Sequence, residues 1–400
     1  MIKINKKALR EISNSGTKDI DPRIKPMDWK KFLGAECVYI GTHNGHFHPD
    51  EIYCVALIYL IKYLMAKEHF GKNVLYPSLV EFVAHSVIRA STINDLIELG
   101  IEKRPYIIVD VRGGHYDHHQ SCQGLVDRVY NSNNIIIRHA KRTPPDLLMN
   151  ESYKRLCSFG SLWRAVGKLF NIDLSDLNPE QKMCYDNETI ENNVLRDIFD
   201  EIAFPVSLVD TNGPDLFECT YSKIISDMNL TEENVYNDLP GKDQPFAKAV
   251  EIAYAILAGA IVSSQNKYIS IAEAYKKCLF KENKDFINYL EIPEVSNPDD
   301  EVKLGISTLN ELIIPSKQGE TARLYFLFNP NPSTRDGCCR LVMSKWGKLD
   351  VTSITKHWSK YVFIHPDGFL MTFSNKEDAE EFIEKLNIQG CIDNKLILGV

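Results

Sequence analysis

Residues 106–120, with the sequence YIIVDVRGGHYDHHQ, constrain the fold of this chain more than any other segment. An apolar run ends in Asp110, and a Gly-Gly turn follows. Three polar residues then stand side by side: Asp117, His118 and His119. An apolar run that ends in Asp is typical of a buried parallel strand whose carboxylate lies at the carboxyl edge of a sheet. Asp and neutral His together are expected ligands for Mn²⁺, Mg²⁺ or Zn²⁺, so the segment predicts a metal site; a solvated, His-rich loop is the alternative.

A second segment has the same layout. The short apolar run 38–40 leads into residues 41–50, GTHNGHFHPD, and a long amphipathic stretch follows. This loop contributes His43, His46, His48 and Asp50. Of the eleven His in the chain, six lie in these two short loops, and this clustering favours a metal site over a chance collection of histidines.

The predicted strands alternate with helices in the first half of the chain. Strands are expected at residues 37–40, 79–83 and 106–110, with helices after Asp50 and at about 93–99. This alternation predicts an α/β fold with a doubly wound, mainly parallel sheet.

A third apolar run, residues 206–209, ends in Asp210 before the turn sequence TNG. An isolated Asp in this position is more often a turn or cap residue than a ligand. Beside two similar strand ends, however, Asp210 becomes the expected final carboxylate. The helices before it are predicted from residue 158 and at about 193–202, the second ending at Pro205.

The pattern changes towards the C-terminus. Helical periodicity covers residues 246–258 and 268–280, and a linker or long loop is expected around 293–301. Strands are predicted at 324–328, 340–343 and 361–365, followed by a closing helix at 377–386. We therefore expect three parts: an irregular tail, 1–36; a metal-binding domain, 37–230; and a helical connector with a smaller α+β domain, 231–400.

The overall composition excludes several classes of protein. No run of about 18 apolar residues is present, so no membrane partner is expected. The ten Cys form no CxxC pair, which argues against a thiolate zinc site and a disulfide framework. A reducing compartment fits best, either cytoplasm or nucleus, with the mitochondrion as a further option. The net charge of −8 does not favour binding of a polyanion by overall charge, so local positive charge or metal must supply the attraction.

The motifs THNGHFHPDE, VDV…YDHHQ and VDTNG, in this order, resemble the Myg-type exonuclease family of the DHH phosphoesterase superfamily. Residues 361–369, YVFIHPDGF, resemble the last motif of that family. The resemblance implies two metal ions, with Mn²⁺ expected and Mg²⁺ as the alternative, and cleavage of RNA from its 3′ end. The implied ligands are His43, His48, Asp50, Asp110, His118 and Asp210. Asp110 would bridge the ions, Asp117 would orient the His pair, and His119 would face the scissile phosphate.

The chain departs from the family pattern at several positions. His46 and Pro49 stand where Thr and Cys are usual, and Ser207 replaces an expected Asp. Phe159 occupies a position that is usually Ala, and residues 370–372 replace glycines that let the substrate backbone approach. All six implied ligands are nevertheless present.

The leading hypothesis is a metal-dependent phosphodiesterase, a 3′→5′ exonuclease acting on RNA. Residues 335–360 carry six Lys or Arg against two acids, and Trp346 and Trp358 could stack bases, or both could be core residues. Arg89 and Arg164 are further cleft candidates, although surface Arg on helices is common. The alternatives are a hydrolase of small phosphates, such as a dinucleotide or pyrophosphate, and a catalytically silent protein that binds metal and RNA. No feature of the sequence indicates the oligomeric state.

Overall fold

The computed structural model describes residues 2–10, 12, 20–71, 76–117, 138–140, 155–174, 187–231, 244–277, 279–282, 288–292, 325–328, 339–343, 348–387 and 395–398. The chain forms two compact units. The first contains Met1–Ile172 and Asn192–Gln265, and the second contains Asp173–Glu191 and Asn266–Val400. The boundary expected near residue 230 therefore falls inside the first unit.

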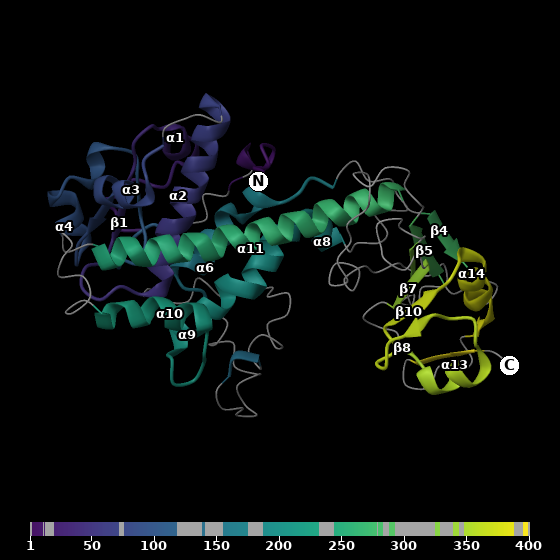
Figure 1. Cartoon of the computed structure of the whole chain (residues 1–400). Helices are drawn as coiled ribbons and strands as arrows, with labels where there is room; N and C mark the ends of the chain where they lie inside the picture. Colours follow the sequence, from purple (N-terminus) through teal and green to yellow (C-terminus); the bar gives the residue numbers. More distant parts are fainter. Residues whose placement is uncertain are drawn as a thin grey trace. The chain divides into compact units, whose positions relative to one another are not determined.

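A three-stranded parallel sheet organises the first unit, and Figure 1 labels its central strand, β1. Its strands, in spatial order, are β2 (Val87–Arg89), β1 (Tyr39–Thr42) and β3 (Tyr106–Ile108). Both pairings are parallel, so all three carboxyl ends lie at one edge of the sheet. The connections contain the helices α2 (Pro49–Phe70), α3 (Leu79–Ser86) and α4 (Ile93–Glu98). A mixed α/β fold with a parallel sheet is thus confirmed, whereas its doubly wound arrangement stays a prediction.

The strand predicted at residues 79–83 is wrong, because this stretch begins helix α3. Ser78 caps the helix: its Oγ accepts from the backbone N of Glu81 at 3.3 Å, and the Glu81 carboxylate accepts from Ser78 N at 2.8 Å. The buried residues Leu79, Phe82 and Val83 have helical spacing. A reciprocal cap of this kind favours a helix over the β propensity of a short apolar run. Strand β2 follows directly after α3.

The apolar run at 206–210 is also helical, not a strand. It belongs to α9 (Phe204–Asn212), which continues from α8 (Asn187–Ile198) through a π-helical stretch, η6 (Phe199–Ala203). Pro205 lies in the first turn of α9 and does not end a helix there. The π-helical stretch just before Pro205 changes the local hydrogen-bond pattern, so the helical run continues past a residue that has no N–H to donate. Asp210 therefore lies near the end of a helix.

Helix α2 is the centre of the first unit. The residues from Ile52 to Ile61 are buried on every side of the helix, as expected for a core helix. The helix contacts α9, α6 (Ser158–Val166) and α10 (Thr220–Asp227). The beginning of α6 at residue 158 agrees with the sequence prediction. Because α2 follows the His-rich loop, its burial fixes the position of that loop.

Helix α11 (Gln244–Lys277) is continuous, whereas two helical stretches were predicted, and Phe280 lies in a strand. Within the described residues, its segment Pro245–Ile269 is the one stretch long and apolar enough to cross a membrane, with a mean hydropathy of 1.6. The buried core helix of a soluble protein can have the same length and mean hydropathy. One row of buried residues in α11 recurs every three or four positions, which is the pattern of a helix with one face in a core: Phe246, Val250, Ala253, Leu257 and Ile261.

The second unit contains a six-stranded sheet. Its strands, in spatial order, are β4 (Leu279–Glu282), β5 (Asn288–Ile292), β6 (Tyr325–Phe328), β7 (Cys339–Met343), β10 (Leu370–Phe373) and β9 (Phe363–Ile364). Only the β5–β6 pairing among these is parallel. A smaller described sheet contains β11 (Leu386–Asn387), β12 (Lys395–Leu398) and β8 (Lys348–Leu349). Strands occur where 324–328, 340–343 and 361–365 predicted them, but the α+β class of this domain stays a prediction.

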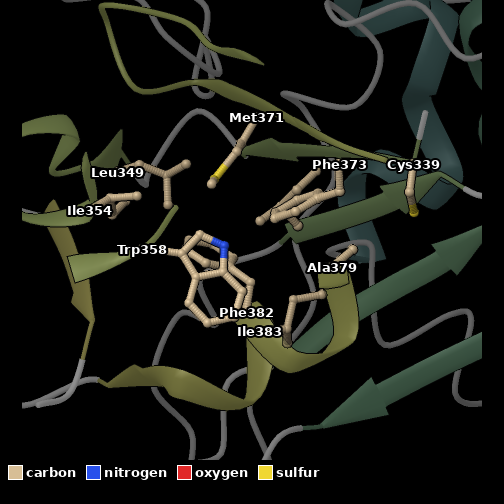
Figure 2. Close-up of a cluster of buried hydrophobic side chains, with 10 residues drawn as sticks. Cys339, Leu349, Ile354, Trp358, Met371, Phe373, Ala379, Phe382 and Ile383 are labelled. Carbon is tan, nitrogen blue, oxygen red and sulfur yellow. The ribbon is translucent and has the colours of Figure 1, made fainter. Parts of the chain in front are cut away.

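Figure 2 shows the apolar core of the second unit, which includes Trp358. This core lies among strands of the larger sheet, α13 (Val351–His357) and α14 (Lys376–Lys385). Trp358 is 6% exposed, and its ring centroid lies 5.6 Å from that of Phe382. Of the two interpretations of this tryptophan, the core residue is therefore correct. Trp346 lies outside the described residues.

Gly160 allows α6 and α9 to approach closely, so a side chain at this position should destabilise the protein. A Cβ at this position would lie 2.5 Å from Ser207 Oγ and 3.1 Å from a Leu156 methyl group. We expect Gly160→Ala to lower the free energy of unfolding by about 1–3 kcal/mol, because it overpacks the contact. Adding Ser207→Ala should recover part of that loss. Urea unfolding of both single variants and the double variant measures the coupling, and strictly additive effects would show that this contact is not the cause.

Candidate metal centre

The sheet delivers two of the expected ligands at its carboxyl edge. His43 directly follows β1, and Asp110 lies two residues beyond β3. The backbone of Asp110 has φ 53°, in the left-handed region that Asp tolerates better than most residues. Its N–H donates to Tyr116 O at 2.9 Å, and Tyr116 N donates to Ile108 O at 3.1 Å. The turn therefore closes back onto β3 and holds the Asp110 side chain at the sheet edge.

One candidate group contains His43, His48 and Asp110. His43 Nε2 lies 3.2 Å from Asp110 Oδ2, and His48 Nδ1 lies 3.9 Å from the same oxygen. Asp110 is buried, while His48 is exposed. This arrangement leaves the group accessible from the His48 side.

A second candidate group contains His48, Asp50 and Asp210. Asp50 lies in the first turn of α2, and Asp210 lies near the end of α9. In each group the ligand atoms lie within 4.8 Å of one another. Five of the six expected ligands are thus brought together from three separate parts of the chain. His48 is the residue common to both groups, so the expected bridging by Asp110 stays a prediction.

None of the other described residues that the sequence predicted for the site belongs to either candidate group. His118 and His119 lie outside the described residues. Asp117 is buried, and its Oδ2 accepts from Gly113 N at 3.0 Å, so it stabilises the Gly-Gly turn after Asp110. His46 is exposed and belongs to neither group, and Arg164 is exposed on α6. Arg89 ends strand β2 at the same sheet edge as His43.

The carboxylates at this site are buried close to one another. Burial and the nearby Asp50 and Glu51 carboxylates raise the pKa of Asp110 to about 11. Burial, together with Asp50 and Asp110, also raises the pKa of Asp210 well above its usual range. Like charges in a buried cluster destabilise each other, and a divalent cation relieves that repulsion. The His and carboxylate donors fit Mn²⁺, Mg²⁺ or Zn²⁺.

Glu51 is a site residue that the sequence analysis missed. Its Oε1 lies 3.1 Å from His43 Nε2 and accepts from His48 N at 3.0 Å, and its Oε2 accepts from Thr42 Oγ1. Burial raises the pKa of Glu51 to about 7. Glu51 stands three residues after His48, which is the usual spacing between an N-cap residue and a capping Glu. This spacing could have identified Glu51 from the sequence.

Comparison with known families adds an independent observation. The model of the uncharacterised protein family UPF0160, MYG1_exonuc, matches residues 39–297. The chain belongs to this family. The match covers all the ligands of both candidate groups. Membership of the MYG1 family and the candidate metal groups together fit a metal-dependent phosphoesterase.

Two further comparisons add little. No curated protein matches this MYG1 family member. A solved DHH domain, described as a member of a family of ribosomal proteins, is 12% identical over 90% of this chain and 89% of that chain. The TM-score is 0.24, a value at which two folds need not be the same.

Replacing Asp110 with Asn should stabilise the metal-free protein. A buried carboxyl with a raised pKa contributes stability below its unfolded pKa of about 4, and this contribution is lost as the pH rises towards the folded value. At pH 8 we expect Asp110→Asn to increase the free energy of unfolding by about 1 kcal/mol or more, with a smaller gain at pH 5. Stabilisation by Mn²⁺ should grow with pH in the parent and be lost in the variant. Thermal unfolding at both pH values, with and without Mn²⁺, tests this; an equal gain at both would contradict the charge argument.

Replacing Glu51 with Gln should weaken metal binding. The Gln amide is neutral, so it removes a negative charge beside His43, and only one of its two terminal atoms accepts hydrogen bonds, whereas both carboxylate oxygens of Glu51 do so. We expect a loss of Mn²⁺ affinity of about 10–100-fold, as for other groups that orient metal ligands. Glu81→Gln is a matched control, because Glu81 caps α3 in the equivalent position away from the site. Calorimetric titration distinguishes the two, and equal affinity in both variants would exclude the role of Glu51.

Proposed function

We propose that this chain is a 3′→5′ exonuclease that hydrolyses RNA with two metal ions. The observation that carries the proposal is the pair of ligand groups that share His48 at the carboxyl edge of the sheet. Ligands of α/β proteins typically bind at this edge. Membership of the MYG1 family supports phosphodiester hydrolysis, and the name of the family model, MYG1_exonuc, refers to an exonuclease.

The residues divide naturally between two ions. His43 and Asp110 would hold one ion, Asp50 and Asp210 would hold the other, and His48, which belongs to both groups, would bind one of the two. Mn²⁺ is the proposed ion and Mg²⁺ the alternative, since both accept carboxylate and imidazole ligands. When bound, such a pair supplies a hydroxide nucleophile and stabilises the negative charge that develops during phosphodiester cleavage. We further propose His118 as the sixth ligand and His119 as the residue facing the scissile phosphate.

The chain itself would favour an anionic substrate at this position. Asp50 lies in the first turn of α2, so the backbone N–H groups of the helix start lie beside the ligands. A helix N-terminus stabilises a phosphate through these N–H groups and the helix dipole. The exposed side chain of His48 marks the side from which a substrate can approach.

The function is tested with 5′-labelled single-stranded RNA and Mn²⁺, with and without a chelator. We expect a ladder that shortens from the 3′ end and disappears with the chelator. Asp50→Asn and Asp210→Asn should each reduce the rate by about 100-fold or more, because each removes a ligand of the pair that stabilises the transition state. Asp227→Asn is the matched control, since Asp227 is exposed on α10 and belongs to neither group.

A parent protein that binds Mn²⁺ but leaves RNA intact would contradict the proposal. Dinucleotides and pyrophosphate, tested under the same conditions, then separate the two remaining hypotheses. Cleavage of these small phosphates alone would identify a small-molecule phosphohydrolase. No cleavage of any substrate would favour the catalytically silent protein that binds metal and RNA.

A further inference from the structure

The loop at residues 43–48, here called the metal loop, is held by an arginine from the neighbouring strand. Arg89 Nε donates to His43 O at 3.1 Å, and Arg89 Nη2 donates to Gly45 O at 2.7 Å. Arg89 pairs with Thr42 in the sheet, directly before the loop begins. One rigid guanidinium therefore fixes two carbonyl groups of the loop.

Those two carbonyl groups flank the residue that sets the tautomer of His43. The Nδ1 of His43 lies 2.8 Å from Asn44 O, and because a carbonyl only accepts, Nδ1 carries the proton. With the proton on Nδ1, Nε2 is the nitrogen that can bind a metal, and it faces Asp110 and Glu51. Arg89 thus holds the backbone on both sides of the carbonyl that prepares His43 for a metal.

A second anchor comes from the distant residue Asn229. Phe47 N donates to Asn229 Oδ1 at 3.0 Å, and Asn229 Nδ2 donates to Phe47 O at 2.7 Å. Both backbone polar groups of Phe47 are therefore satisfied by one side chain. Asn229 belongs to the 3₁₀ turn η7 (Met228–Thr231), and Phe47 directly precedes His48.

Phe246 connects the two anchors. Its ring contacts the Phe47 ring edge-on, with centroids 5.8 Å apart at 89°. The Arg89 guanidinium lies over the Phe246 ring at 4.5 Å from the centroid. Both Phe rings are 1% exposed. Because one buried ring contacts both the loop and Arg89, the loop and its anchors form one packed unit.

We infer that Arg89, Asn229 and Phe246 are positioning residues, a loop clamp that sets the affinity of the metal loop for a divalent cation. The inference rests on the proposed metal centre. The metal loop supplies two ligands from irregular backbone, and binding is strongest when such ligands are held in place beforehand. The loop clamp holds the metal loop in place with residues from three elements: β2, η7 and α11.

The charge of Arg89 makes the inference sharply testable. A cation beside a metal site repels the metal ion. If charge were the only effect of Arg89, its removal would therefore strengthen Mn²⁺ binding. Loss of the anchored backbone would instead weaken binding. A positioning role and a purely electrostatic role therefore predict opposite changes in affinity.

The experiment is a calorimetric Mn²⁺ titration of the full chain, with thermal unfolding of each metal-free variant beside it. We expect Arg89→Met and Asn229→Ala each to weaken Mn²⁺ binding by about 10-fold or more. Arg89→Lys should be intermediate, because it keeps the charge but not the two-point contact. Arg104→Met is the matched control, since Arg104 also stacks on a ring, that of Tyr39, at the opposite end of the sheet.

Each outcome decides the question. Weaker binding in variants whose metal-free melting temperature is within a few degrees of the parent supports the clamp. Tighter binding by Arg89→Met, or unchanged affinity in both clamp variants, overturns it while leaving the metal centre intact. No Mn²⁺ binding by the parent overturns the metal centre and the clamp together. If Arg89→Met does not fold, Asn229→Ala decides, because it changes no charge and lies on a separate element.

Discussion

The burial of several carboxylates at one point is the interaction on which the rest of this structure depends. Asp50, Glu51 and Asp110 are each at most 1% exposed, and Asp210 has a buried carboxylate oxygen beside them. Such a cluster opposes folding when every member is ionised, and the raised pKa values of Asp110 and Asp210 express that opposition. A protein keeps a cluster of this kind where a cation compensates it, and the neighbouring His43 and His48 complete a donor set suited to that cation.

The scaffold explains how the cluster is assembled. Parallel pairing of β1 with β3 places His43 and Asp110 at one edge, because parallel strands end on the same side of a sheet. The core helix α2 begins at that edge and contributes Asp50. Helix α9 contacts α2 and contributes Asp210, which is 160 positions away from Asp50 in sequence. Helices α2 and α9 carry Asp50 and Asp210, and a turn closed onto β3 carries Asp110. The two histidines lie on a loop that needs separate anchoring.

Much of the candidate site could be predicted from the sequence because its expected ligands lie in short motifs. The run before Asp110 and the cluster of His43, His46 and His48 indicated a metal site without any knowledge of the fold. The strand predicted at 79–83 and the comparison of the run 206–209 with a strand end are wrong for the same reason. A short apolar run suits a buried helix as well as a buried strand, and its periodicity does not separate the two. The capping pair Ser78–Glu81 was the local signal for the first helix, and Pro205 was misread as the end of a helix when it lies in a first turn.

The sequence by itself determined which chemistry this chain can support, since the ligand types and their grouping are written in two loops. Only the tertiary structure decided which residues support those ligands. The anchoring of the metal loop by Arg89 and Asn229 joins residues whose spacing carries no motif. Asn229 lies 182 positions from Phe47, and such a pair meets only because the packing of several elements brings it together. A motif records neighbours along the chain, whereas the geometry of a metal centre depends on neighbours in space.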